Sequence, residues 1–134
     1  MLGHVDAAQA IAEMVEISPQ VREVVVVGAD GGVVGSNAAT PERAQRLADG
    51  AGQLLAAADR DQPELAQLEA ATTVGSVFVV RDGDRVIAAT TTPEPTVGLV
   101  FYDLKTCLRS IDPPKPKRRR RAAAPPEGEA DASA

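Results

Sequence analysis

The sequence predicts an α+β domain whose elements follow the order helix, two strands, helix, three strands, helix. This order follows from apolar, β-branched runs that flank Asp-Gly turns and from three amphipathic stretches with apolar residues at helical spacing. The run from Val24 to Val27 is too apolar for a surface strand, so we expect it near the middle of a sheet. Residues Gly28 to Gly32 tolerate positive φ, and Val33 to Asn37 returns as the second strand of a hairpin.

The first helix is predicted from about Asp6 to Ile17. Apolar residues recur there at three- and four-residue spacing, which is typical of a helix with one buried face. The expected buried stripe contains Ala8, Ile11, Ala12 and Val15. Ser18 precedes Pro19, which disfavours helical backbone at Ser18, so we expect the helix to end there.

A longer helix is predicted from about Thr40 to Ala58. Thr40 can accept a hydrogen bond from a helix N–H that has no partner, and Pro41 suits the first helical position, where a donor is not needed. Its apolar stripe is expected to contain Ala44, Leu47, Ala48, Ala51, Leu55 and Ala58, with Gly52 close by. Small residues on one face let another backbone approach closely. Two interpretations stay open: the stripe packs on the protein's own sheet, or part of it meets a second copy.

Three strands are predicted after a polar break that contains Pro63. Leu65 to Val74 alternates only roughly and is rich in alanine, so it is a weak strand. Ser76 to Val80 and Arg85 to Thr91 are strong strands, and the turn Asp82-Gly83-Asp84 joins them as a second hairpin.

The last helix is predicted from about Val97 to Ser110. Its apolar stripe is expected to contain Val97, Val100, Phe101, Leu104, Leu108 and Ile111. Asp103 is expected mostly outside this stripe. Cys107 lies beside it and is predicted to be a small buried hydrophobic residue. It is the single cysteine, so neither an intramolecular disulfide nor a thiolate metal cluster can form.

The periodic apolar pattern ends near Asp112, so we predict a folded domain over residues 1–112 and a disordered tail over residues 113–134. The basic residues of the tail are Lys115, Lys117, Arg118, Arg119, Arg120 and Arg121, and acidic residues follow them. Since the whole chain has a formal net charge of −5 and the tail is positive, the domain carries about −8. This acidity argues against nucleic-acid binding by the folded domain. The tail is either a solubilising segment or a tether to a membrane, a nucleic acid or another acidic partner, and nuclear import is a third option.

No catalytic or cofactor-binding constellation can be assembled from the sequence. His4 is the only histidine and has no metal-ligating neighbours in sequence. The turn Gly28 to Gly32 lacks both glycine-rich phosphate-binding spacings, and a strand follows it, so no helix N-terminus is there to receive a phosphate. We therefore expect no cofactor, no metal and no enzymatic activity. Because no apolar run matches a bilayer span and no signal peptide is evident, we expect a cytoplasmic protein.

Three segments resemble the roadblock/dynein light chain family, in particular its small stand-alone bacterial members. They are the helix and linker Ile11 to Val21, the strand-turn-strand Glu23 to Asn37, and Thr96 to Leu104, where a Gly-Leu pair precedes an aromatic residue. The resemblance implies a profilin-like, three-layer α/β/α fold, with a five-stranded antiparallel sheet between the long middle helix and the two terminal helices.

The resemblance also implies a homodimer or a heterodimer with a paralogue, in which edge strands join two sheets and two middle helices lie side by side. The residues implied at this interface are Ala51, Leu55, Leu65, Gln67, Leu68 and Glu69.

Members of this family bind and regulate small Ras-like GTPases or act as adaptor subunits in larger assemblies. The resemblance therefore implies a non-catalytic regulator or co-activator of a small GTPase, or else an adaptor that works without regard to nucleotide. The residues implied at the partner surface are Arg43, Arg46, Leu47, Gly50, Gln53 and Leu54. Arg43 or Arg46 could act as an arginine finger. We favour the milder interpretation, in which the protein positions the GTPase's own residues.

Overall fold

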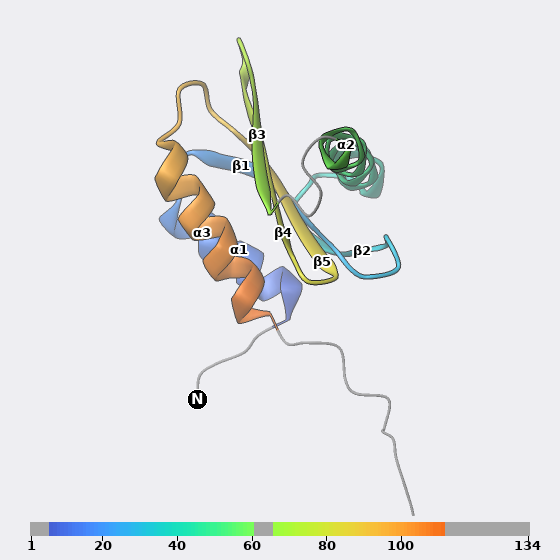
Figure 1. Cartoon of the computed structure of the whole chain (residues 1–134). Helices are drawn as coiled ribbons and strands as arrows, with labels where there is room; N and C mark the ends of the chain where they lie inside the picture. The colour runs from blue at the N-terminus through green and yellow to red at the C-terminus, as the bar shows by residue number, and fades with distance from the viewer. Residues whose placement is uncertain (1–5, 61–65, 112–134) are drawn as a thin grey trace, which may run out of the picture.

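The computed structural model describes residues 6–60 and 66–111, which form three helices and one five-stranded sheet (Figure 1). In chain order the elements are α1 (Ala7–Ile17), β1 (Val21–Val27), β2 (Val33–Ser36), α2 (Pro41–Asp59), β3 (Gln67–Thr72), β4 (Gly75–Asp82), β5 (Arg85–Thr91) and α3 (Val97–Ser110). The sheet has the order β2-β1-β5-β4-β3, and every neighbouring pair is antiparallel. The predicted element order and the antiparallel sheet are confirmed.

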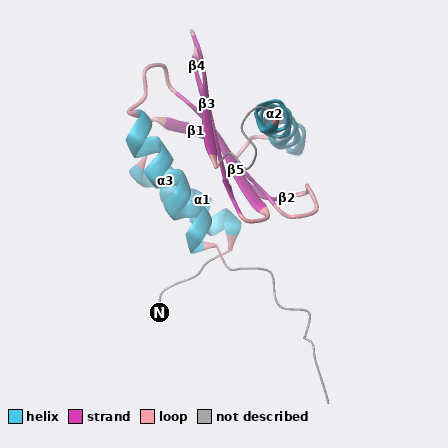
Figure 2. Ribbon diagram, viewed as in Figure 1, coloured by secondary structure: helices cyan, strands magenta, loops and turns pink. Residues whose placement is uncertain are grey.

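Helices cover both faces of the sheet. Helices α1 and α3 lie side by side on one face, and α2 lies on the other (Figures 1 and 2). Each face has its own apolar core, and β1 contributes to both cores because neighbouring side chains of a strand point to opposite faces. Val24 and Val26 face α1 and α3, whereas Val25 faces α2. The valine run is therefore buried on both sides, and the predicted three-layer fold is confirmed.

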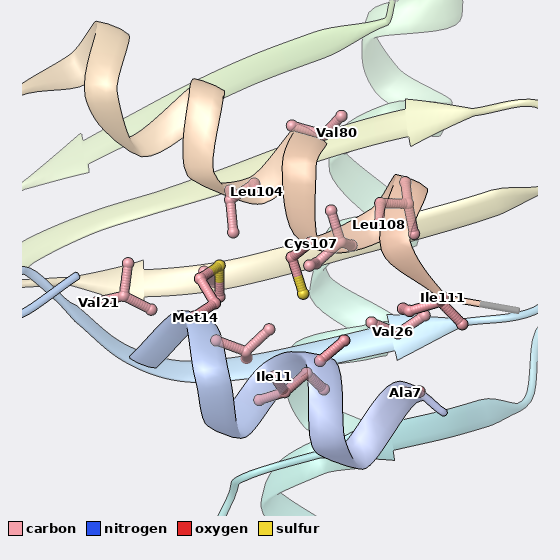
Figure 3. Close-up of a cluster of buried hydrophobic side chains, with 14 of the residues drawn as sticks. Ala7, Ile11, Met14, Val21, Val26, Val80, Leu104, Cys107, Leu108 and Ile111 are labelled. Carbon is pink, nitrogen blue, oxygen red and sulfur yellow. The ribbon is translucent and has the colours of Figure 1, made fainter. Parts of the chain in front are cut away.

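The larger core lies between the sheet and the pair α1 and α3 (Figure 3). Phe78 of β4 is its largest fully buried side chain, and its ring meets the edge of Phe101 at a centroid distance of 4.9 Å. The predicted face of α1 was wrong in part, because Ala8 and Ala12 are exposed. The helix instead buries Ala7, Ala10, Ile11 and Met14. This rotation places the large Met14 side chain in the core, which removes more apolar surface from water than an alanine would.

The contact between α1 and α3 includes a buried hydrogen bond that the sequence did not suggest. The hydroxyl of Ser18, just after α1, donates to Oδ2 of Asp103 at 2.8 Å. Both residues are buried, so Asp103 lies inside the predicted apolar stripe of α3, while Val97 is exposed. The expected positions of Asp103 and Val97 were therefore wrong. The bond from Ser18 offsets the cost of burying a carboxyl group.

Cys107 is buried on α3, as predicted, and its burial should make the stability of the domain depend on pH. Burial, with a smaller contribution from the carboxylate of Glu13, raises the pKa of the Cys107 thiol from 9.0 to about 11. The unfolded thiol loses its proton from about pH 9 upward, whereas the folded thiol keeps it until about pH 11. The contribution of the thiol to the free energy of unfolding is therefore fully present below pH 9. We expect about 2 to 3 kcal/mol of that free energy to be lost between pH 9 and pH 11.

Chemical denaturation at a series of pH values measures this loss. Cys107→Ala is the control, because its free energy of unfolding should lack the thiol's share of the decline. Equal pH dependence in both proteins would contradict the prediction. In the folded wild type a thiol reagent should also react far more slowly with Cys107 than in denaturant.

Candidate functional site

Helix α2 begins where the sequence predicts. Thr40 precedes the helix with extended backbone, and its Oγ1 accepts a hydrogen bond from the N–H of Arg43 at 3.1 Å. Pro41 occupies the first helical position, where the absence of an N–H costs no bond. Ala44, Ala48, Ala51 and Leu55 are buried beneath the helix against the sheet. The cap and these four small or apolar residues fix which side of α2 faces outward.

One flank of α2 carries all six residues implied at the partner surface. Arg43, Arg46 and Gln53 are exposed, and Leu47, Gly50 and Leu54 are half-buried. They recur at three- and four-residue spacing, so they form one stripe along the helix. Leu47 and Leu54 contact the edge of the core beneath α2, and a Cβ at Gly50 would meet no atom within 4 Å. The stripe, here called the α2 flank, combines charged and apolar groups.

The residues implied at a dimer interface fall in two places. Ala51 and Leu55 pack on the protein's own sheet, with 1% and 6% of their surfaces exposed, so their side chains belong to the core. Gln67, Leu68 and Glu69 lie on β3, which the strand order places at one edge of the sheet. Leu65 lies outside the described residues. Of the two interpretations left open for the small-residue face of α2, these positions favour packing on the protein's own sheet for Ala51 and Leu55.

Helix α2 leaves part of its face of the sheet uncovered. Its principal contacts are with β1, β2 and β5. Leu68 of β3 and Val77 of β4 point to the same face and remain half-buried beside the core under α2. An apolar strip next to an edge strand is therefore accessible in the described part of the chain.

Near the start of α2, two adjoining cavities are lined by arginines. Each has a volume of about 340 Å³, and they share Glu23, Arg43 and Thr90. Arg22 lines one of them and Arg46 the other. Nε of Arg43 donates to Oε2 of Glu23 at 2.8 Å, and a terminal nitrogen of Arg43 lies at the same distance from that oxygen. Here β1 meets α2, so strand and helix together hold the guanidinium of Arg43 in place.

Sequence reasoning missed Arg22 and Glu23 as neighbours of α2. They lie in β1, some twenty residues before the helix, and the register of β1 against β5 shifts between Val21 and Val24. A register shift changes the direction of the side chains around it, and the pattern of apolar residues in the sequence does not predict where such a shift occurs. The pairing of Glu23 with Arg43 depends on this tertiary arrangement.

At its far end α2 is tied to the sheet by a second ion pair. Both terminal nitrogens of Arg81 donate to the carboxylate of Asp59, at 3.1 and 2.9 Å. This bidentate hydrogen bonding lowers the pKa of Asp59, and it outweighs partial desolvation, which acts in the opposite direction. Both ends of α2 are thereby held to strands, which presents the α2 flank on a rigid element.

The described residues hold no group of three or more His, Cys, Asp or Glu side chains placed to bind a metal ion. His4 and the basic residues of the tail lie outside residues 6–60 and 66–111. Within those two ranges, no helix is both long and apolar enough to cross a membrane.

Comparison by sequence gives no match to a family model or to a curated protein. Comparison by structure gives clear matches. A Roadblock/LC7 domain from Streptomyces avermitilis matches with a TM-score of 0.68 and 18% identity over 79% of this chain and 94% of that domain. A second Roadblock/LC7 domain structure from the same organism gives 0.66 and 23%, over 81% and 100%.

MglB of Myxococcus xanthus matches with a TM-score of 0.64 and 15% identity, over 78% of this chain and 83% of MglB. These identities are low, but the shared architecture extends over nearly the whole of each Roadblock/LC7 domain. The described part of the chain therefore has the Roadblock/LC7 fold.

Proposed function

We propose that this protein is a non-catalytic, cytoplasmic regulatory module that engages a small Ras-like GTPase through the α2 flank, acting as a dimer. The observation that supports this most is the α2 flank itself. It presents exposed charged groups beside half-buried Leu47 and Leu54 on a helix fixed at both ends. Such a mixture of apolar and hydrogen-bonding groups suits a protein partner. The fold and the resemblance to the roadblock/dynein light chain family support a GTPase as that partner.

The geometry of Arg43 favours positioning over an arginine finger. Two of its nitrogens already contact Glu23, and about half of the side chain is exposed. A finger would have to leave this ion pair to reach a transferring phosphoryl group. Arg46 makes no ion pair among the described residues, so it is available to contact a partner directly.

A dimer in this proposal forms through the edge of β3 and the strip beside it. An edge strand presents unpaired N–H and C=O groups that a second strand can bond. Half-buried Leu68 and Val77 lie next to that edge on the α2 face. A second copy, or a paralogue, would cover Leu68 and bring its own α2 alongside. Gly52, around which a Cβ would meet no atom within 4 Å, leaves room for such an approach.

Leu68→Arg should convert the dimer to a monomer, because a charged group would be buried at the interface. Size-exclusion chromatography with light scattering measures the mass in solution. Val34→Arg is the matched control, since Val34 is exposed on β2, the opposite edge strand, and that variant should stay dimeric. Circular dichroism checks that both variants are folded. A wild-type monomer at every concentration, or dissociation by Val34→Arg alone, would contradict the β3 interface.

The function is tested by a pull-down from native lysate with the tagged full chain, once with a non-hydrolysable GTP analogue and once with GDP. We expect a small GTPase to be recovered mainly with the GTP analogue. Arg46→Glu should reduce its recovery at least about tenfold, while Arg60→Glu, an equal charge change at the far end of α2, should leave it nearly unchanged. The hydrolysis rate of the recovered GTPase, with and without this protein, then gives the direction of regulation.

Recovery of the same partners in both nucleotide states, with no GTPase among them, would overturn this proposal in favour of a nucleotide-independent adaptor. In either case the basic residues 115–121 remain a proposed tether. Co-sedimentation with vesicles tests this tether. If residues 115–121 bind a membrane, the protein should sediment with vesicles that contain anionic lipid and not with neutral ones.

A further inference from the structure

We infer that the two arginine-lined cavities at the start of α2 form a docking site for a carboxylate-bearing segment of a partner protein. The inference deepens the proposed function, because Arg43 and Arg46 belong to the α2 flank. It goes further in adding Arg22 of β1 and in specifying the chemistry of the bound segment.

Three arginines line these two adjoining cavities, together called the arginine-lined hollow. The two cavities adjoin at Glu23, Arg43 and Thr90, and Arg22 and Arg46 stand on either side. Arg22 and Arg46 form no ion pair with a carboxylate among residues 6–60 and 66–111. Arg43 uses Nε and one terminal nitrogen on Glu23. Its other terminal nitrogen remains available to an incoming acceptor.

The charge of this hollow is opposite to that of the domain. Its lining includes three arginines and one glutamate, whereas the chain as a whole has a formal net charge of −5. Guanidinium groups pair with carboxylates through two parallel hydrogen bonds, which add geometric specificity as well as energy. A local positive potential on an acidic protein also steers an acidic segment to this place and keeps it from binding elsewhere.

A protein segment suits the hollow better than a nucleic acid does. A nucleic acid would bring a long run of phosphates against the acidic remainder of the domain, which would repel it. A short acidic segment places its charge only where the arginines are. The rim also offers apolar contact, because Val74 at the turn between β3 and β4 is 73% exposed and lines the same cavity as Arg22. The bound segment should therefore carry carboxylates next to an apolar residue.

The test uses the purified full chain and a short fluorescent peptide of glutamates around a central leucine, with binding followed by fluorescence anisotropy at low salt. We expect Arg22→Glu and Arg46→Glu each to weaken binding at least about fivefold. Arg60→Glu should change it less than about twofold, and a peptide with glutamine in place of glutamate should not bind. Added salt should weaken binding of the acidic peptide.

Equal weakening by Arg60→Glu, binding of the glutamine peptide, or tighter binding of inorganic polyphosphate than of the acidic peptide would each overturn the inference. The GTPase pull-down separates this result from the proposed function. If the wild type recovers a GTPase and fails to bind the acidic peptide, the docking site is wrong and the proposed function stands. If the acidic peptide binds at the arginines and no GTPase is recovered, the docking site stands and the proposed function is wrong.

Discussion

Replacing Gly75 by alanine should lower the free energy of unfolding by about 3 kcal/mol or more. A Cβ at Gly75 would clash with the carbonyl oxygen of Thr91, which is backbone and cannot rotate away. The φ of Gly75 is +153°, a region that side chains rarely allow. To relieve the contact, the first residues of β4 must move away from the end of β5. Because a domain of this size is stable by only about 5 to 15 kcal/mol, the loss should be plain in urea denaturation.

Gly83→Ala is the matched control for that experiment. Gly83 also has positive φ, at +63°, but a Cβ there would meet no atom within 4 Å. Its replacement should cost about 1 kcal/mol through backbone conformation alone. The difference between the two variants then measures the steric contact. If Gly75→Ala were no less stable than Gly83→Ala, the close approach of β4 to Thr91 would be refuted.

Phe78→Ala should cost about 4 kcal/mol of unfolding free energy. Phe78 is fully buried at the centre of the larger core and also meets the edge of the Phe101 ring. Truncation would leave a cavity that the surrounding sheet and helices cannot close and would remove the aromatic contact. Guanidinium denaturation followed by circular dichroism measures the change.

Phe78→Leu serves as the comparison, because it keeps most of the volume and should cost no more than about 2 kcal/mol. An equal loss in both variants would show that the ring contact, and not the filled volume, dominates. A loss below about 1 kcal/mol for Phe78→Ala would show that this core repacks readily, contrary to our expectation.

The sequence predicted the structure best where neighbouring residues alone determine the backbone conformation. The valine run of β1, the Thr40 cap and the Asp82-Gly83-Asp84 turn each dictate backbone structure through neighbouring residues, and all were found as predicted. The alanine-rich stretch after Leu65 had weak β propensity. It nevertheless pairs with β4 from Gln67 to Thr72, because tertiary pairing outweighs propensity at a sheet edge.

Prediction failed where a choice depends on packing between distant elements. The buried side of α1 is the side that carries the large Met14 side chain and not Ala12. Asp103 is buried because it accepts a hydrogen bond from Ser18, which is eighty-five residues away in sequence. The arginine-lined hollow joins β1 to α2 across a register shift, so Arg22 could not be assigned to it from the pattern. The α2 flank was foreseeable as a stripe, whereas the hollow at its start was not.

The position of Asp6 and Ile111 has a practical consequence for engineering. Asp6 and Ile111 are the first and last residues that the structure describes. They line one cavity of about 500 Å³, together with the turns that join β1 to β2 and β4 to β5. The arginine-lined hollow involves the opposite ends of β1 and β5. A fluorescent reporter or an immobilisation anchor fused ahead of Asp6 or behind Ile111 therefore starts at a single corner, away from the start of α2. Both kinds of fusion should report on binding without obstructing it, and a circular permutant that joins these two ends needs only a short linker.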